Sequence, residues 1–311
     1  SEFNIEDVIM DDEYEVESLN LDVNYLKELD ADKLLAGFRE SAGLDMKGAT
    51  RYEGWENSLI GGHTIGHYMT AVAQACVNPN VSAADKTTLT DKLNYIVDAL
   101  LECQNNTKGK AGFIFGSTIV NSGNVEKQFD NVESNATNIT TQSWVPWYTM
   151  HKIIAGLVSV YELTGYENAK TVASGLGDWT YNRASSWSEA KRNTVLGIEY
   201  GGMNESLATL YTITGNEKYL EAAKMFDNEN VFPGLSQGED TIKNLHANQH
   251  IPQIVGAMAE YRATGDEYYH NIAKFFFDIV TQHHMYAIGG VGRGEIFRMP
   301  DELAINIESD R

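Results

Sequence analysis

A repeat with a period of 50 residues constrains the fold of this chain more than any other sequence feature. The motif Tyr-x-x-Thr-Gly begins at Tyr161, Tyr211 and Tyr261. Each copy follows an apolar stripe with helical spacing and precedes a second helical segment, and its glycine suits the left-handed turn that ends a helix. Each repeat is therefore predicted to be a helix, a tight turn and a second helix, with the three tyrosines at equivalent positions.

Other stretches fit the same plan. Residues 62–77 form one apolar helical stripe and residues 83–103 a second, whereas strand signals are few. A period near 50 residues suits pairs of helices of about 15–20 residues each, and about six such pairs fit into the chain. The sequence is thus predicted to be all-α and built from helical hairpins.

The charge of the chain excludes two classes of partner. It has 23 basic and 44 acidic residues and a net charge of −21, whereas nucleic acids and anionic membranes select for Lys and Arg. No apolar run approaches the roughly 18 residues that a membrane span needs. Much of the acidity lies in residues 1–31, which we interpret as a solvated N-terminal lead-in to a helical domain over residues 32–311.

Histidines and an asparagine recur just ahead of the repeat tyrosines. His151, Asn204 and His246 precede Tyr161, Tyr211 and Tyr261, and His63 and His67 lie at the start of the stripe over residues 62–77. If the first helices of the hairpins lie side by side, these groups ring one mouth and suit a neutral polyhydroxy ligand. Aromatic faces would come from Trp55, Trp144, Trp147 and Tyr148. The alternative is that each histidine only satisfies a helix end.

Two long loops interrupt the helices, over residues 104–143 and 285–300, and loops of such length often carry function. Glu295 follows the glycine-rich run of the second loop, where backbone can approach a ligand closely. A carboxyl in a partly apolar pocket has a raised pKa and can protonate a leaving oxygen. From the local sequence alone, an exposed loop carboxylate is the simpler interpretation.

Other chemistries find little support. The pairs His63/His67 and His246/His250 have the spacing of helical zinc ligands, but position 64 is Thr, so no His-Glu-x-x-His motif is present. The spacing of glycines 290, 292 and 294 is wrong for a dinucleotide fingerprint, and no strand precedes them. Cys76 and Cys103 lie in apolar helical stripes and are interpreted as core residues.

Five motifs carry a family resemblance. In chain order they are Gly61-Gly-His63-Thr-Ile-Gly66-His67-Tyr68, Trp144-Val-Pro146-Trp147-Tyr148-Thr-Met-His151-Lys152, Gly201-Gly202-Met203-Asn204-Glu205, Leu245-His246-Ala247-Asn248 and Gly294-Glu295-x-Phe297-x-x-Pro300-Asp301-Glu302-Leu303. Together they resemble the beta-L-arabinofuranosidase-type enzymes of glycoside hydrolase family 127 and close relatives, over about residues 20–311.

The resemblance implies an (α/α)6 toroid of helical hairpins that removes terminal L-arabinofuranose from plant-type glycans with retention of configuration. It implies that Glu295 is the general acid/base and that His151 and His246 line the sugar pocket, with His63, His67 and Asn204 as secondary assignments. Trp147 is predicted, from its aromatic face alone, to bind substrate beside them. The resemblance also implies a cysteine nucleophile bound to zinc. A secreted or cell-surface location is favoured by this class of substrate.

The chain departs from the family pattern in one respect. The Glu-x-Cys zinc motif of the family follows Pro-Asp-Glu-Leu, and the sequence ends at Arg311 before such a stretch. Zinc is therefore expected in the full-length enzyme and no zinc ligand is expected from this chain. We expect the toroid to be incomplete at its C-terminus, the chain alone to be inactive, and the exposed face to favour self-association.

Two alternatives to a hydrolase remain open. One is a non-catalytic carbohydrate-binding module that kept the toroid. The other is a different six-hairpin enzyme, such as an unsaturated uronyl hydrolase or a sugar epimerase. A uronyl substrate needs basic residues to bind its carboxylate, and near the motifs these are scarce apart from Lys152 and Arg293.

Overall fold

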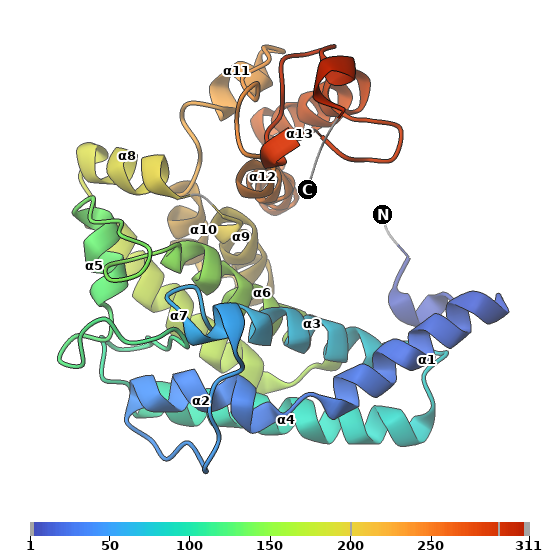
Figure 1. Ribbon diagram of the computed structural model, residues 1–311, viewed down its shortest axis with the longest axis vertical. Coiled ribbons are helices and arrows are strands. Elements are labelled where there is room, and N and C mark those ends of the chain that lie inside the picture. The colour runs from blue at the N-terminus through green and yellow to red at the C-terminus, as the bar shows by residue number, and fades with distance from the viewer. Residues whose placement is uncertain (1–2, 200, 292, 308–311) are drawn as a thin grey trace. The chain divides into compact units, whose positions relative to one another are not determined.

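A computed structural model describes residues 3–199, 201–291 and 293–307 (Figure 1). The regular structure of these residues is helical, apart from an isolated antiparallel bridge between His246 and Ile296. The predicted all-α class is confirmed. The chain divides into two compact units, which we call unit 1 (residues 1–182) and unit 2 (residues 183–311). None of the described helices combines the length and the apolar character that crossing a membrane requires.

The α-helices of unit 1 are α1 (Glu13–Glu28), α2 (Ala31–Ala42), α3 (Thr64–Val77), α4 (Ala83–Asn105), α5 (Lys127–Glu133), α6 (Pro146–Thr164) and α7, which runs from Glu167 to Ala184. Those of unit 2 are α8 (Glu189–Ile198), α9 (Met203–Thr214), α10 (Glu217–Lys224), α11 (Phe232–Ser236), α12 (Ala247–Thr264) and α13 (Glu267–Ile279).

The three repeats have the same local structure. Gly165, Gly215 and Gly265 end α6, α9 and α12 at φ values of 70°, 71° and 71°. The N–H of each glycine donates to the carbonyl of the repeat tyrosine four residues earlier, at 2.7–2.9 Å. Only glycine adopts this left-handed geometry without strain. The prediction that the tyrosines occupy equivalent positions is confirmed for the turns that they precede.

In unit 1, α3 packs against α6 through two glycines. A Cβ atom on Gly66 would lie 1.9 Å from the Lys152 carbonyl oxygen, and one on Gly156 would lie 2.5 Å from the Gly66 carbonyl oxygen. Both separations are far below van der Waals contact, so a side chain at either position would force the helices apart. The two backbones therefore touch, and the first turn of α3 lies against the part of α6 between Lys152 and Gly156.

The acidic lead-in forms α1, which lies alongside α3 and α4 (Figure 1). Lys92 of α4 donates to the carbonyls of Leu26, at 3.3 Å, Lys27, at 2.8 Å, and Leu29. An ammonium group at the C-terminal end of a helix satisfies its last carbonyls and opposes its dipole. The lead-in thus packs on the rest of unit 1, and the predicted domain boundary at residue 31 stays a prediction.

In unit 2, α12 also packs closely against α9, and again a glycine lies at the point of contact. A Cβ atom on Gly256 would lie 2.1 Å from Oδ1 of Asn204. Asn204 is completely buried, and its amide donates to the Gln253 carbonyl at 3.0 Å. The amide thereby satisfies a backbone group at the crossing of the two helices.

A pair of buried carboxyls lies beside this crossing. Glu260 occupies the repeat position of Val160 and Leu210, and all three are completely buried. Burial and the neighbouring Asp227 carboxyl raise the pKa of Glu260 well above its usual value. Burial raises the pKa of Asp227 to about 6, even though Asp227 accepts a hydrogen bond from the Tyr269 hydroxyl at 2.9 Å. A carboxyl without full compensation in the core favours its neutral form.

Candidate active site

A glutamate–histidine pair joins the glycine-rich loop to the start of α12. Nε2 of His246 lies 2.9 Å from Oε2 of Glu295, and each side chain is about one-third exposed, at 35 % and 33 %. His246 is the residue that precedes the first turn of α12. The two residues that the sequence nominated for acid/base catalysis and sugar binding are thus in direct contact and open to a ligand.

The residues next to the pair hold it in place. The Asn244 N–H donates to the Phe297 carbonyl at 2.6 Å, and the Phe297 N–H donates to the Leu245 carbonyl at 2.9 Å. Phe297 is completely buried and packs edge-on against Phe276, with ring centroids 5.8 Å apart. This short bridge fixes the backbone immediately after Glu295, so the carboxylate does not move freely with the loop.

Glu295 itself has a strained backbone. Its φ is 59°, directly after Gly294 at 73°. Residues other than glycine rarely adopt this region, and the cost is of order 1 kcal/mol or more unless the surroundings impose it. Such strain clusters at functional sites, so the observed outlier supports a functional role for this carboxylate.

His250 supports the pair from the next turn of α12. It is 4 % exposed, and its Nδ1 donates to the His246 carbonyl at 2.7 Å. Because a carbonyl only accepts, Nδ1 carries the proton of the neutral ring. Burial lowers the pKa of His250 against the opposing effect of this hydrogen bond, so the ring stays neutral and ties down the backbone of His246.

In unit 1, a second glutamate organises the N-terminal end of α3. Oε2 of Glu56 accepts from the Gly62 N–H at 2.8 Å, and Oε1 accepts from the N–H and hydroxyl of Thr64 at 3.1 and 2.6 Å. Nδ1 of His63 lies 3.0 Å from Oε1 as well. The carboxylate thus satisfies donors that the start of a helix leaves unpaired. Sequence analysis missed Glu56, because no spacing relates it to a helix that begins eight residues later.

The other histidines of unit 1 gather around the same helix ends. The side chain of His67 on α3 reaches solvent, while partial desolvation lowers its pKa, helped by nearby Lys152, His63 and His151. His151 is 5 % exposed. The structure therefore brings the three predicted histidines of unit 1 together. That they share one concavity with His246 and Glu295 of unit 2 stays a prediction.

Tryptophans that look alike in the sequence have different surroundings. Trp147 is 1 % exposed and packs against Phe129 and Trp179, with ring centroids 4.8 and 5.5 Å away. Trp55 is 65 % exposed and Trp144 half-buried. Neither Trp147 nor the completely buried Asn204 reaches solvent, and their roles as sugar contacts stay predictions.

The described residues do not fit a zinc site. Among them, no group of three or more His, Cys, Asp or Glu side chains is arranged to hold a metal ion. Burial raises the pKa of the Cys103 thiol to about 12, and burial also raises that of Cys76, whose Sγ accepts from the Thr90 hydroxyl at 3.4 Å. Zinc ligation and nucleophilic attack both need a thiolate, which these surroundings oppose.

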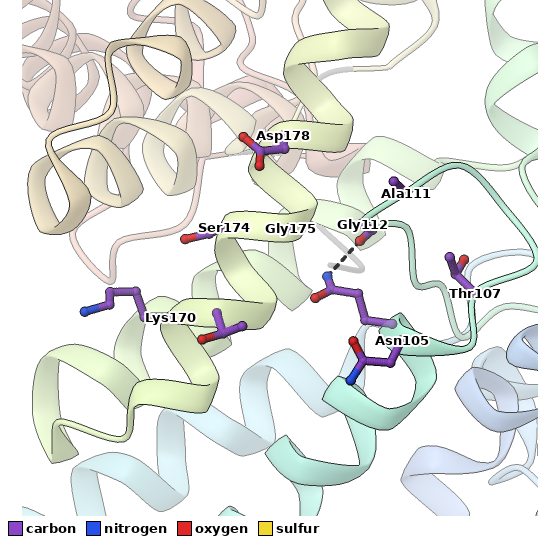
Figure 2. A pocket seen from close by; sticks show the side chains of 10 residues that line it. Asn105, Thr107, Ala111, Gly112, Lys170, Ser174, Gly175 and Asp178 are labelled. Carbon is purple, nitrogen blue, oxygen red and sulfur yellow. Dashed lines mark hydrogen bonds between the residues drawn. The ribbon is translucent and has the colours of Figure 1, made fainter.

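A cavity of about 700 Å³ lies elsewhere in unit 1, between the end of α4, the loop over residues 107–112 and α7 (Figure 2). The Gln104 amide bridges its two sides by donating to the Gly112 and Val172 carbonyls at 2.8 and 2.9 Å. Its lining contains no histidine and no aromatic residue. None of the predicted site residues contributes to this cavity, so it is separate from the candidate active site.

Comparison with known proteins now decides the family. A model of the beta-L-arabinofuranosidase GH127 catalytic domain matches residues 7–309. The chain belongs to this family. A search of curated protein sequences finds no match.

Two solved structures share the fold. The GH127 beta-L-arabinofuranosidase Ara127N-Se from Geobacillus stearothermophilus T6 is 17 % identical with a TM-score of 0.59, and the match covers 92 % of this chain and 45 % of that one. The GH127 beta-arabinofuranosidase BT3674 is 18 % identical with a TM-score of 0.58, covering 96 % and 46 %. The predicted family and its helical toroid class are confirmed, and the chain spans less than half the length of these relatives.

Proposed function

We propose that this GH127 domain hydrolyses terminal beta-L-arabinofuranosides of plant-type glycans, with Glu295 as the general acid/base. The observation that carries the proposal is the strained, anchored position of Glu295 against His246 in the loop that matches the family motif. Membership of a family of glycoside hydrolases supports the reaction class.

In this proposal, Glu295 donates its proton to the glycosidic oxygen as the bond from that oxygen to the anomeric carbon breaks. The carboxylate then takes a proton from the water that releases the sugar. His246 positions the carboxyl through the 2.9 Å contact. His250 acts through His246, because its Nδ1 holds the backbone carbonyl of that residue.

The retaining mechanism also needs a nucleophile opposite the acid. The family resemblance implies a zinc-bound cysteine, which has no counterpart among the described residues. Cys76 is half-buried and Cys103 is buried, and burial raises the pKa of both thiols, so both favour the protonated form. We therefore propose that this nucleophile lies outside the described residues and that the chain alone turns over arabinofuranosides only slowly.

Azide rescue tests this arrangement directly. Azide attacks the anomeric carbon in place of the missing nucleophile, the carbon–oxygen bond breaks, and Glu295 protonates the departing oxygen. The chain is incubated with azide and either a beta-L-arabinofuranosyl disaccharide, whose leaving group needs a proton, or 2,4-dinitrophenyl beta-L-arabinofuranoside, whose leaving group does not. We expect an alpha-L-arabinofuranosyl azide from both.

The matched variants then identify the acid. Glu295→Gln is expected to lower the rate on the disaccharide by about 10²–10⁴-fold and to spare the dinitrophenyl substrate. Glu239→Gln replaces an exposed carboxylate of unit 2 and should change neither rate. Equal rates for Glu295→Gln and the unchanged chain on the disaccharide would contradict the assignment.

A non-catalytic carbohydrate-binding function is the second candidate. It is favoured by the surroundings of Cys76 and Cys103, which oppose the thiolate that a nucleophile needs. Binding of the disaccharide, measured by calorimetry, without any azide product would establish it in place of the hydrolase.

We add two proposals, one on self-association and one on location. We propose that copies of the chain associate through a groove of about 480 Å³ on α12 and α13, where Ile251, Val255 and Phe277 are exposed. Within unit 2, α9 packs against α12, so we propose a helix of a second copy as the complement of the groove. Light scattering tests this by comparing the molar mass of Val255→Lys with that of the unchanged chain, and the variant is expected to have the lower mass.

We also propose an extracellular location, because the substrate class favours it.

A further inference from the structure

Two indole rings of unit 1 are held at the protein surface. Trp55 is 65 % exposed, and its ring meets that of Trp144 edge-on, with centroids 6.1 Å apart and planes at 73°. Burying a large aromatic ring is among the strongest gains in folding. A pair of rings that forgoes this gain presents an apolar surface to a ligand rather than to the core.

A buried glutamine fixes both segments that carry the rings. Gln128 is 3 % exposed, and its amide donates to the Leu59 carbonyl at 3.0 Å and to the Ser117 hydroxyl at 2.7 Å. Its Oε1 accepts from the Trp144 N–H at 3.1 Å. One side chain therefore connects the Trp144 backbone to the segment that follows Trp55, and the backbone that carries the two rings is held in place before any ligand arrives.

Glu56, the residue after Trp55, has a structural role. Glu56 follows Trp55 in the same short helical turn, and both of its oxygens accept hydrogen bonds from the start of α3. A carboxylate engaged in this way supports the turn and is not available for proton transfer to a ligand. The site around Trp55 is therefore suited to binding and not to hydrolysis.

His63 adds a polar group at the edge of the indoles. Its ring centroid lies 6.4 Å from that of Trp55. Its Nδ1 donates to the Ile60 carbonyl at 3.0 Å, so the neutral ring keeps its acceptor lone pair on Nε2. An indole face beside a hydrogen-bond acceptor matches a sugar ring, which has an apolar C–H face and hydroxyl groups around its rim.

We propose that Trp55 and Trp144 form a stacking platform for a saccharide ring, with Nε2 of His63 accepting a hydrogen bond from one of its hydroxyls. The class of ligand rests on the proposed function, and the platform itself rests on the geometry of unit 1. Its role is affinity for the glycan, separate from the proton transfer assigned to Glu295.

Calorimetric titration with a beta-L-arabinofuranosyl disaccharide tests the platform. All variants carry Glu295→Gln, which prevents turnover and leaves unit 1 unchanged. Trp55→Ala is expected to weaken binding about tenfold, because stacking on an aromatic ring contributes of order 1 kcal/mol beyond the area it buries. Trp55→Phe keeps a smaller ring and should weaken binding about two- to threefold. Trp187→Phe, a tryptophan of unit 2 that packs against Phe226, is the matched control.

The outcomes separate the platform from the catalytic proposal. Weaker binding by Trp55→Ala with an unchanged melting temperature supports the platform, whether or not the azide assay yields product. Unchanged affinity in Trp55→Ala, or no binding by the parent Glu295→Gln protein, overturns it. Failure of the azide assay alone contradicts the proposed hydrolysis by Glu295 and leaves the platform standing.

Discussion

The Glu56–His63 pair of unit 1 and the Glu295–His246 pair of unit 2 have nearly equal atomic separations, 3.0 and 2.9 Å. Their surroundings differ. The Glu56 carboxylate is 14 % exposed and also accepts three hydrogen bonds from the start of α3. Glu295 is 33 % exposed and has a backbone φ of 59°. The backbone around a glutamate–histidine pair, rather than the pair itself, therefore separates a helix cap from a candidate acid.

The largest expected difference is in catalysis. In the azide assay, Glu295→Gln should lower the rate on the disaccharide by about 10²–10⁴-fold, whereas Glu56→Gln should change it less than tenfold, because Glu56 touches no reacting atom. Rates are measured from the released sugar at saturating disaccharide. Equal losses in the two variants would end the distinction between the pairs.

The next effect concerns buried carboxyls, which unit 2 has at Asp227 and Glu260. Folding raises the pKa of Asp227 from 3.8 to about 6 and raises that of Glu260 above 4.5. Folding therefore takes up protons. For Asp227 this contribution is complete below about pH 4 and is lost as the pH rises through about 6, a change of about 3 kcal/mol, and the contribution of Glu260 changes in the same direction.

Glu260→Leu restores the residue type of Val160 and Leu210 in the earlier repeats. The variant should be more stable than the unchanged chain near pH 7 and should lose the part of the pH dependence of urea unfolding that Glu260 contributes, while the part due to the burial of Asp227 remains. The charged and titratable neighbours of the carboxyl pair are Arg192, Lys224, Glu229, Tyr268 and Tyr269. Lys224→Met is the control for a general charge effect, and an unchanged pH slope in Glu260→Leu would contradict the prediction.

A smaller effect is expected from Glu56→Ala. It removes the acceptor for the N–H groups of Gly62 and Thr64 at the start of α3. Loss of a helix cap typically lowers the free energy of unfolding by about 1–2 kcal/mol. Chemical denaturation followed by far-UV circular dichroism measures this. Glu53→Ala, an exposed neighbour, should change stability very little.

The smallest effect has the opposite sign. Glu295→Gly relieves a left-handed backbone at a non-glycine residue, and we expect it to raise the free energy of unfolding by roughly 0.5 kcal/mol while abolishing acid catalysis. Glu302→Gly, at a φ of −96°, should lower stability by about the same amount. A loss of stability in Glu295→Gly would mean that the contact with His246 outweighs the strain.

The repeat allowed much of the fold to be predicted. The glycine after each Tyr-x-x-Thr fixed the turn chemistry, and the stripes predicted over residues 62–77 and 83–103 correspond to α3 and α4, which begin and end within two residues of them. The acidic lead-in is the exception, since α1 is anchored by Lys92 through contacts between distant parts of the chain. Sequence patterns do not encode such contacts.

The candidate site was only partly predictable. The motif identified Glu295 and His246, but it gave no sign of the left-handed φ of Glu295 or of the backbone bridge that Phe297 forms with Asn244 and Leu245. Trp55 and Trp147 are the same residue type, so the sequence does not distinguish them. Tertiary packing leaves Trp55 exposed and buries Trp147. Glu260 did leave a signal, because a carboxylate takes the place of Val160 and Leu210 in the repeat.

The contact between α3 and α6 limits how this protein can be altered. Gly66 and Gly156 have no side chain to select for function, yet one added methyl group at either would push apart the helices that carry His67 and His151. A mutant library designed to change the surface of unit 1 therefore has its narrowest freedom at two buried glycines whose only role is to let two helix backbones touch.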